Sequence, residues 1–400
     1  MTRQSYSRRS FLRNTGLGLV VASFSVFGCA RVAPTTDASG YLVYIGTNVN
    51  SETENTIFLY RLNPTTGALT PVSGLKGGAS PTYLTLDAKR QHLYAVNETS
   101  TFRGAPSGAV SAFAIDPKTG NLTLLSQEPS QGGSPCYISL DRSEKAVLVA
   151  NYMGGNVSVL PVQADGRVGA PTAMDQHQGT GPHKNQTAPH AHCILPDPAN
   201  KYSFAVDLGT DKVYGYQLDP ATGKLTSNAE PAFTTKPGAG PRHLTFHPNG
   251  RNAYLINELN STVTSLAYDA GKGTFTEIQT VSTLPTGFVG DNSCADIHVS
   301  PDGKFLYASN RGHNSIAVFA IDNSSNLTLI QHESTQGKTP RNFTLDPAGR
   351  LLLVGNQNSN NVFTYHVDQK SGKLRPTGQS IEIPSPMFLF VTADFTQGSK

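Results

Sequence analysis

Length, composition and charge exclude several classes of protein. The chain has 400 residues, no Trp, only 15% charged residues, and 38 Gly and 26 Pro, which together make up 16% of the sequence. Soluble proteins average about 12% Gly and Pro, so the excess argues against a fold of long helices. No apolar run approaches the roughly 20 residues that a membrane span needs, which excludes a multi-pass membrane protein. The net charge of +3 comes without a cluster of Lys and Arg, which argues against nucleic-acid binding.

The first thirty residues predict a twin-arginine export signal. Arg8 and Arg9 stand just before Phe11, and an apolar stretch over 17–27 follows, as in signals of this kind. We expect a signal peptide over 1–29, a linker over 30–40, and delivery to the periplasm by the twin-arginine machinery. Two processing routes stay open. The run 26–29 (VFGC) resembles a lipoprotein box that would lipidate Cys29 and anchor the protein to the membrane, whereas 28–30 (GCA) resembles an ordinary cleavage site.

The cysteines indicate a fold without disulfides. Beyond Cys29 there are three, Cys136, Cys193 and Cys294, an odd number without Cys-x-x-Cys spacing. Neither a disulfide framework nor a zinc ribbon is therefore predicted.

A short pattern recurs along the rest of the chain. It consists of an aromatic or apolar residue, two small or apolar residues and a polar one, usually Asn. The seven copies, spaced 46 to 56 residues apart, occupy 44–47, 94–97, 148–151, 204–207, 254–257, 307–310 and 353–356. A turn pattern, Asp/Asn-Pro-x-Thr-Gly-x-Leu, runs in phase with it, most clearly at 63–69, 116–122 and 219–225. Such turns join antiparallel strands.

The repeat predicts an all-β fold, a single seven-bladed β-propeller over 41–395 followed by a tail at 396–400. In the second unit, four strands are expected at 83–86, 92–96, 109–115 and 122–126, and four antiparallel strands per repeat of this length form a propeller blade. The C-terminal segment 385–391 resembles the first strand of a unit, while the chain enters the repeat at its second strand. We therefore expect the C-terminal strand to close the ring by joining the N-terminal blade.

Two positions in each unit are expected at one mouth of the central channel. The first position, at the start of strand one, holds Thr82, Cys136, His192, Arg242, Ala295, Arg341 and Met387, with Asp296 one step beyond Ala295. The second position, just after strand two, holds Asn48, Glu98, Tyr152, Leu208, Glu258, Arg311 and Gln357. Long insertions at 99–107, 173–191 and 280–293 open on the same face. Ionisable groups beneath gathered loops favour a ligand site, although ion pairs that only hold the blades together are the alternative.

The His-rich segment 177–192 raises the possibility of a metal site. His190 and His192 would lie on the same face of a strand, and a carboxylate could complete a coordination shell. No His-Glu-x-x-His motif, phosphate-binding loop, dinucleotide fingerprint or Gly-x-Ser-x-Gly elbow accompanies them. We therefore predict no metal and no cofactor.

Five longer runs stand out in the repeated units: 240–250 (GPRHLTFHPNG), 254–263 (YLINELNSTV), 297–303 (IHVSPDG), 307–313 (YASNRGH) and 339–343 (TPRNF). These runs resemble the seven-bladed lactonase family, which includes bacterial 6-phosphogluconolactonase and fungal carboxy-muconate cyclases. The resemblance implies lactone hydrolysis, or the reverse closure, without an obligatory metal. It places the family's active-site His at His192 or His190, its Arg at Arg242 and Arg311, and its carboxylate at Glu258. Asp296 departs from the Glu that family members more often carry.

The expected mechanism follows from these residues. Glu258 or His192 is predicted to act as general base on water, and Arg242 to stabilise the oxyanion. The predicted substrate-binding residues are Arg311, Arg341, His190, Glu98 and Asp296. Since an exported protein does not meet cytoplasmic phosphorylated sugars, the expected substrate is an unphosphorylated or other anionic sugar-acid lactone. The alternatives are a carboxy-muconate-type cycloisomerase and a non-catalytic propeller that binds an anionic carbohydrate or a partner.

Overall fold

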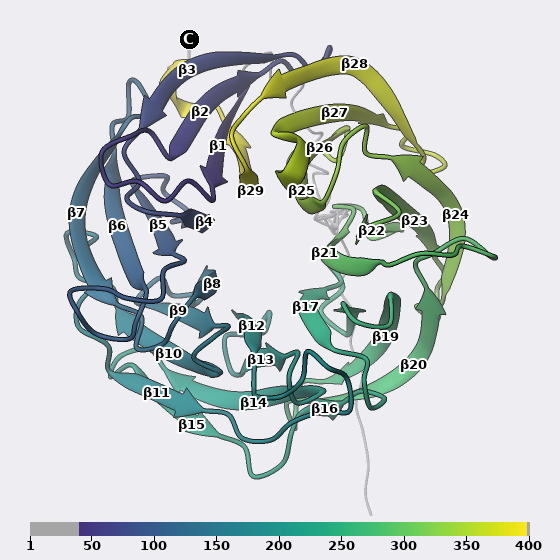
Figure 1. The fold of residues 1–400 in the computed structure, drawn as a ribbon, viewed down its shortest axis with the longest axis horizontal. Helices are drawn as coiled ribbons and strands as arrows, with labels where there is room; N and C mark the ends of the chain where they lie inside the picture. Colours follow the sequence, from purple (N-terminus) through teal and green to yellow (C-terminus); the bar gives the residue numbers. More distant parts are fainter. Residues whose placement is uncertain (1–39, 398–400) are drawn as a thin grey trace, which may run out of the picture. The chain divides into compact units, whose positions relative to one another are not determined.

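The computed structural model describes residues 40–397, and their regular structure is almost entirely β-strand (Figure 1). Seven antiparallel sheets, here called blades, follow one another around a ring, and each blade has one strand next to the central channel. The seven blades predicted from the repeat are confirmed. Within this part of the chain, no helix is long and apolar enough to cross a membrane.

The strand bounds are given blade by blade, from the innermost strand outward. The first blade consists of β29 (Pro386–Ala393), β1 (Tyr41–Thr47), β2 (Ile57–Leu62) and β3 (Leu69–Leu75). The second consists of β4 (Pro81–Leu86), β5 (His92–Asn97), β6 (Ala109–Ile115) and β7 (Leu122–Pro129). The third blade consists of β8 (Pro135–Leu140), β9 (Ala146–Asn151), β10 (Asn156–Pro161) and β11 (Ala173–Gln176). The fourth consists of β12 (Ala191–Pro196), β13 (Ser203–Asp207), β14 (Lys212–Asp219) and β15 (Lys224–Ser227), and β16 (Phe233–Thr234) also pairs with β14.

The last three blades have the same order. The fifth blade consists of β17 (Pro241–Phe246), β18 (Asn252–Asn257), β19 (Thr262–Asp269) and β20 (Thr274–Ser282). The sixth consists of β21 (Ser293–Val299), β22 (Phe305–Arg311), β23 (Ser315–Ile321) and β24 (Leu327–Ser334). The seventh consists of β25 (Pro340–Leu345), β26 (Leu351–Asn356), β27 (Asn361–Val367) and β28 (Leu374–Glu382). Two short 3-10 turns, η1 (Gln357–Ser359) and η2 (Phe395–Gln397), complete the regular structure.

Two of the three insertions are shorter than predicted. The 173–191 segment begins with β11, which pairs with β10 as the outermost strand of its blade. The 280–293 segment begins with the last residues of β20. β11 was missed because a strand of an antiparallel sheet that faces solvent needs little apolar sequence. The second difference is a shift of three residues at the end of β20. The loops that remain are 177–190 and 283–292.

The ring closes as expected from the two ends of the sequence. β29 pairs antiparallel with β1, from Tyr41 opposite Ala393 to Thr47 opposite Pro386. At the far end of this pair, Asp394 N–H donates to the carbonyl of Gly40. The N-terminal blade is therefore held together by both ends of the described chain.

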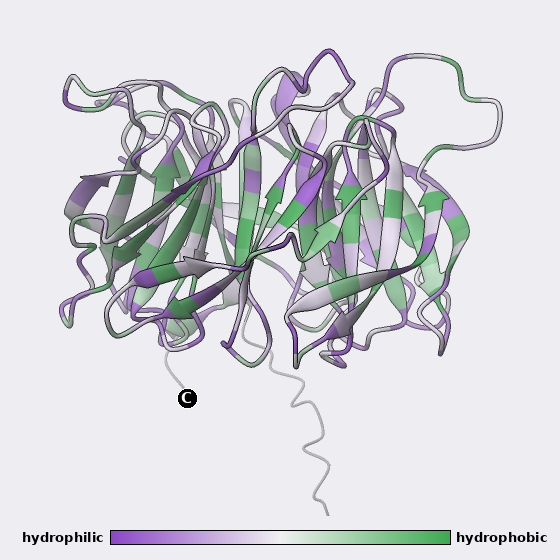
Figure 2. Cartoon of the chain, turned by 90° about the horizontal axis from the view of Figure 1, so that it is seen from below, coloured by the Kyte–Doolittle hydropathy of each residue, from purple (hydrophilic) through white to green (hydrophobic). Residues whose placement is uncertain are grey.

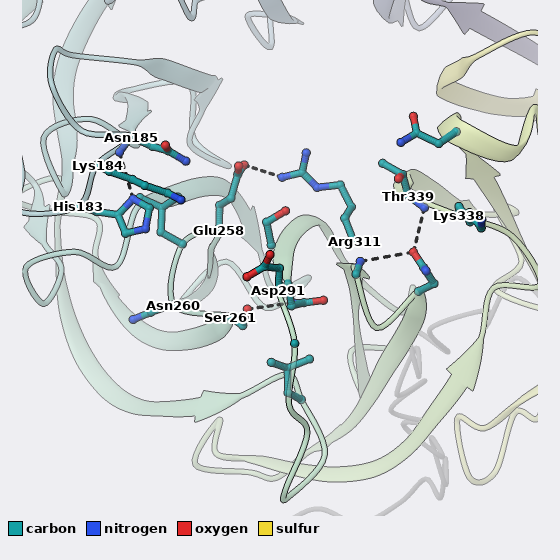
Figure 3. Close-up of a pocket in the computed structure, with 18 residues that line it drawn as sticks. His183, Lys184, Asn185, Glu258, Asn260, Ser261, Asp291, Arg311, Lys338 and Thr339 are labelled. Atoms are coloured by element: carbon teal, nitrogen blue, oxygen red, sulfur yellow. Dashed lines mark hydrogen bonds and ion pairs between the residues drawn. The ribbon is translucent and has the colours of Figure 1, made fainter.

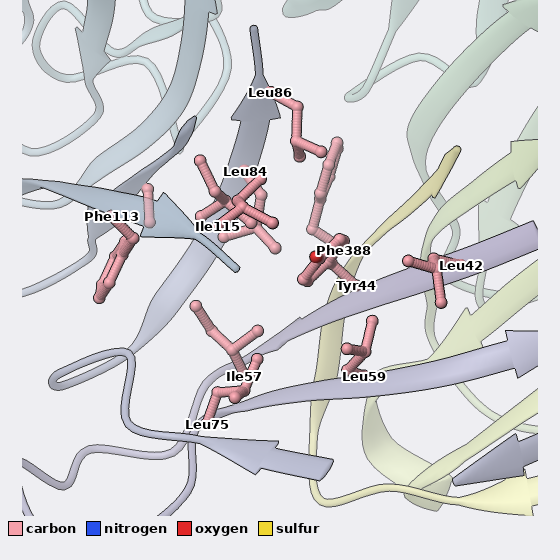
Figure 4. Close-up of a cluster of buried hydrophobic side chains, with 12 residues drawn as sticks. Leu42, Tyr44, Ile57, Leu59, Leu75, Leu84, Leu86, Phe113, Ile115 and Phe388 are labelled. Carbon is pink, nitrogen blue, oxygen red and sulfur yellow. The ribbon is translucent and has the colours of Figure 1, made fainter. Parts of the chain in front are cut away.

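The core lies between neighbouring blades. Figure 4 shows Leu42, Ile57 and Leu59 of the first blade facing Leu84 and Phe113 of the second, all of them buried. Hydrophobic residues concentrate within the blades and polar residues in the connecting loops (Figure 2). This packing makes the blades a rigid frame for the side chains at the channel.

The two repeated sequence patterns meet at the blade boundaries. Tyr44, which begins the first copy of the short pattern, donates its hydroxyl to the carbonyl of Gly120 in the turn of the next blade, at 2.7 Å. Tyr307 makes the same bond to Gly372, at 2.9 Å. Both glycines have positive φ angles, 76° and 70°, which favour Gly. The repeats are therefore linked by hydrogen bonds as well as by apolar contact.

Candidate active site

Every innermost strand contains a β-bulge close to its start. Its register with the second strand of the blade shifts there in all seven blades. The bulged residues are Thr82, Cys136, His192, Arg242, Ala295 with Asp296, Arg341 and Met387. A bulge bends its strand and redirects a side chain. These are the residues of the first predicted position, so the repeat sets one side chain per blade at this end of the channel, here called the mouth.

The second predicted position lies beside these bulges. In six blades, the backbone N–H of this residue donates to the carbonyl of the residue just before the innermost strand, at 2.7–3.0 Å. The six donors are Asn48, Glu98, Tyr152, Leu208, Glu258 and Gln357. In the seventh blade, Arg311 ends β22 and pairs with Ser293 of β21. The backbone therefore brings both predicted sets of side chains to the same mouth.

Glu258 joins two guanidinium groups at the mouth. Its Oε2 lies 2.9 Å from Arg242 Nε and 2.8 Å from Arg311 Nη2. Although burial opposes ionisation, the charges of Arg311 and Arg242 hold the pKa of Glu258 below its ordinary value. Burial and the neighbouring Arg311 lower the pKa of Arg242 to about 10. Glu258 and Arg242 are therefore both charged at neutral pH.

The same two arginines also bind the backbone of β21. Arg242 Nη1 donates to the carbonyl of Ala295, and Arg311 Nη2 donates to the carbonyl of Cys294 at 2.9 Å. Arg242 is almost completely buried, with 2% of its surface exposed. Both guanidiniums are thus fixed before any ligand arrives. Arg341 differs, because the ion pairs found at the mouth in residues 40–397 do not include it.

His192 lies next to Arg242 in a buried position. Its ring meets those of Tyr152 and His243 edge to face, with centroids 5.5 and 5.2 Å apart. Burial, together with the charge of Arg242, lowers the pKa of His192 well below its ordinary value. The imidazole is therefore neutral at physiological pH. Its Nδ1 is buried and has no hydrogen-bond partner within residues 40–397.

Asp296 occupies a different environment from the other predicted site residues. Its carboxylate binds His243 Nδ1 at 2.9 Å and His298 Nε2 at 3.0 Å, and accepts a hydrogen bond from Asn342 Nδ2. Burial opposes ionisation, but His298 and His243 hold the pKa of Asp296 far below its ordinary value. The side chain lines neither of the cavities described next. Its position suits the support of His243 better than contact with a substrate.

Two cavities open at the mouth. The larger has a volume of about 770 Å³ and is bordered by Glu258, Arg311, Lys184, Asp291 and Lys338 (Figure 3). The smaller, of about 10 Å³, is lined by ten residues of the channel wall: Thr82, Tyr83, Glu98, Cys136, His192, Arg242, His243, Arg341, Asn342 and Met387. Because Glu258 lines the larger cavity, Arg242 lines the smaller, and the two form an ion pair, the cavities adjoin at this pair.

The histidines of 177–192 make different contacts, although His190 and His192 both meet the ring of Tyr152. His177 is buried between Asp207, at 2.6 Å, and the hydroxyl of Tyr216, at 2.8 Å. His190 stacks on Tyr152 with centroids 4.4 Å apart. His183 borders the larger cavity, and His192 belongs to the channel. Across residues 40–397, no group of three His, Cys, Asp or Glu side chains is placed to hold a metal ion.

Sequence reasoning identified the mouth but missed part of its lining. The structure brings Glu98, His192, Arg242, Glu258, Arg311 and Arg341 to the two cavities, whereas His190 and Asp296 line neither. Among the residues missed are Lys184, Asp291 and Lys338 of the larger cavity and His243 of the smaller one. Lys338, two residues before β25, was recoverable from the repeat. Lys184 and Asp291 lie in loops without a repeated counterpart.

Comparison with known proteins places this arrangement in a family. The 6-phosphogluconolactonase of Bacillus subtilis is 38% identical over 349 residues, which cover 87% of this chain and 97% of that protein. That of Formosa agariphila is 34% identical over 347 residues, covering 85% and 96%. A solved structure described as the periplasmic gluconolactonase of Pseudomonas aeruginosa is 35% identical, with a TM-score of 0.83, and covers 89% of this chain and 99% of that one. The model of the family "Lactonase, 7-bladed beta-propeller" matches residues 42–391, and the chain therefore belongs to this family.

Proposed function

We propose that this protein hydrolyses a sugar-acid lactone at the mouth of its channel. One observation carries the proposal: the cluster of Arg242, Glu258 and Arg311 stands between a cavity of about 770 Å³, large enough for a sugar lactone, and the His192 side of the channel. Similarity to relatives named 6-phosphogluconolactonase supports the same reaction class.

The proposed substrate is an unphosphorylated lactone such as a gluconolactone. The similar protein from Pseudomonas aeruginosa is described as a periplasmic gluconolactonase, and the signal predicted around Arg8 and Arg9 agrees with such a location. Lys184 and Lys338 border the larger cavity and provide charge for an anionic group on an alternative substrate. We also propose that the protein is exported, either as a soluble periplasmic enzyme or as a lipoprotein attached at Cys29.

The mouth provides the electrostatics that ester hydrolysis needs. Attack by water on the lactone carbonyl converts its oxygen into an oxyanion, which fixed positive charges in a partly buried site stabilise. Arg242 and Arg341 line the smaller cavity and supply that charge. Glu258 holds Arg242 and Arg311 in place. Because its pKa is lowered by both arginines, Glu258 is a weak proton acceptor and serves the site better as an organiser than as the general base.

A hydrolysis assay on the purified protein tests the proposal. Gluconolactone, galactonolactone and 6-phosphogluconolactone are offered at neutral pH, and acid release is compared with the spontaneous rate. We expect catalysed opening of at least one lactone, fastest for an unphosphorylated one, and a loss of about 100-fold or more in kcat/KM in Arg341→Gln, as for the removal of an oxyanion-stabilising group. Binding without turnover would contradict the proposal and favour a non-catalytic propeller. Turnover of carboxy-muconate alone would favour a cycloisomerase.

A further inference from the structure

Three buried polar atoms around the smaller cavity have no partner in the described chain. They are Thr82 Oγ1, Glu98 Oε2 and His192 Nδ1. All three residues line the same cavity of about 10 Å³, which lies next to Arg242 and Arg341. A buried polar atom without a hydrogen bond lowers the stability of the fold, and such atoms are rare in folded proteins. Three of them around one cavity therefore indicate a bound polar molecule.

The size and chemistry of the cavity fit one water molecule. A single water needs a volume of about 10–15 Å³ and two to four polar partners. The Thr82 hydroxyl donates or accepts, a Glu98 carboxylate oxygen accepts, and a neutral imidazole nitrogen of His192 does one or the other. A water molecule that donates to Glu98 and accepts from Thr82 satisfies both and leaves one hydrogen for His192.

Glu98 differs from Glu258 and Asp296, two other carboxylates near the mouth. Oε2 of Glu258 is held by two guanidiniums, and the oxygens of Asp296 are bound by His243, His298 and Asn342. Oε2 of Glu98, in contrast, is buried at the cavity and unpartnered. Its backbone is fixed, since its N–H donates to the carbonyl of Ser80 at 2.8 Å. Of these three carboxylates, Glu98 is the one placed to accept a proton from a water in this cavity.

We propose that the smaller cavity binds the nucleophilic water, with Glu98 as the general base and Thr82 and His192 as its positioning partners. This inference rests on the proposed lactone hydrolysis. The water oxygen forms a bond to the carbonyl carbon, its proton passes to Glu98, and the carbonyl electron pair moves to the oxygen next to Arg242 and Arg341. The electron pair on the oxyanion then re-forms the C=O bond as the ring C–O bond breaks, and the proton on Glu98 passes to the departing ring oxygen. Lactone and water are converted into a hydroxy acid, and Glu98 returns to its carboxylate form.

The experiment combines kinetics with a crystal structure that resolves ordered water. Glu98→Gln keeps the shape of the side chain and removes the base, so kcat is expected to fall 10²- to 10⁴-fold with little change in KM. Thr82→Val removes one partner of the water, and a roughly tenfold lower kcat is expected, as for one lost hydrogen bond. Glu128→Gln is the matched control, because Glu128 lies on β7, the outermost strand of the same blade, and borders neither cavity. It should keep wild-type kinetics.

The outcomes separate this inference from the proposed function. Wild-type activity in Glu98→Gln would overturn the inference and leave lactone hydrolysis standing. A wild-type protein that opens no lactone would contradict the proposed function and the role of Glu98 as a base. In either case the crystal structure decides whether water binds. Density within hydrogen-bonding distance of Glu98, Thr82 and His192 is expected, and a dry or collapsed cavity would refute the water site.

Discussion

Glu258 and Arg311 come from neighbouring blades, and their side chains form an ion pair of 2.8 Å across the blade boundary. The same carboxylate oxygen lies 2.9 Å from Arg242 of its own blade. One side chain therefore both organises the candidate active site and connects two units of the ring. Substitutions at this position should affect stability and activity together.

Glu258→Gln is expected to lower the free energy of unfolding by about 3 kcal/mol. Removing one partner of a buried ion pair leaves the remaining charge uncompensated, and here two guanidiniums would be left facing each other. Urea titration measures the effect. Glu230→Gln is the control, because Glu230 is exposed and lies outside the strands, and it should stay within about 0.5 kcal/mol of wild type. In the double variant Glu258→Gln, Arg311→Gln the loss should be smaller than the sum of the single losses. Simple additivity would contradict the coupling.

The stability of the protein should depend on His243 as the pH falls. Burial is the main cause of a lowered pKa at His243, and the charge of Arg242 is the second. Together they lower the pKa of His243 from 6.5 to about 4. The folded state then binds fewer protons than the unfolded state between these values. The contribution of His243 to the free energy of unfolding is therefore fully present above pH 6.5. It decreases by about 3 kcal/mol in total as the pH falls towards 4.

His243→Gln provides the comparison, because its amide can still donate to Asp296 but does not titrate. Urea titration at several pH values measures the unfolding free energy of wild type and variant. The advantage of wild type over the variant should be smaller at pH 4 than at pH 7. A constant difference over this range would contradict the lowered pKa.

Asp296→Asn distinguishes a supporting role from contact with substrate. The carboxylate is buried and bound to His243, His298 and Asn342, so the amide should lower the unfolding free energy by about 2–3 kcal/mol. Since Asp296 lines neither cavity, KM should change less than about threefold, the equivalent of about 0.7 kcal/mol. Steady-state kinetics at a temperature where the variant is folded measure this. A large rise in KM with unchanged stability would instead support the substrate contact expected from the sequence.

Lys338→Met tests whether the larger cavity recognises an anionic group. Lys338 borders this cavity, and losing one such charge contact should raise KM for 6-phosphogluconolactone about three- to tenfold, or about 0.7–1.4 kcal/mol. KM for an uncharged gluconolactone should stay the same. Lys304→Met is the control, because Lys304 pairs with Asp302 in the turn between β21 and β22, away from the mouth. Equal effects on both substrates would refute charge recognition by Lys338.

Replacing both Arg8 and Arg9 by Lys should stop export. The paired arginines are the recognised feature of a twin-arginine signal, so the variant should accumulate in the cytoplasm with its signal uncleaved, as measured by fractionation and mass spectrometry. Cys29→Ala separates the processing routes. If Cys29 is lipidated, this variant leaves the membrane fraction, whereas an unchanged distribution would support an ordinary cleavage site.

The fold could be predicted from the sequence because each blade repeats the same pattern of apolar strands and turns. The residues at 83–86, 92–96, 109–115 and 122–126 carry the apolar pattern of strands, and the structure places β4 to β7 on them with ends shifted by at most three residues. Ring closure followed from the missing first strand of the N-terminal unit. The outermost strand β11 was missed because it has only four residues, two of them polar, and is paired on one side only.

The candidate site could be predicted only as far as the repeat extends. Arg242, His192 and Glu258 hold repeated positions, so their arrival at one mouth follows from register. Asp296 shares its bulge with Ala295, and alternation along the strand cannot tell which of the two faces the ligand. The pairing of Glu258 with two arginines could not be predicted, because it depends on side-chain geometry. The position of Lys184 could not be predicted either, because the loop that carries it has no counterpart in other blades.

The strand pair that closes the ring also fixes where the chain enters and leaves it. Thr47 and Pro386 stand at the mouth, whereas Tyr41 and Ala393 form the opposite end of the same pair. Gly40 and Asp394 follow there, joined through the backbone. Anything attached through these ends of the ring, whether a lipid, an affinity tag or a bead surface, joins it on the side away from the cavities. Immobilised protein should therefore keep the mouth of its channel open to solution.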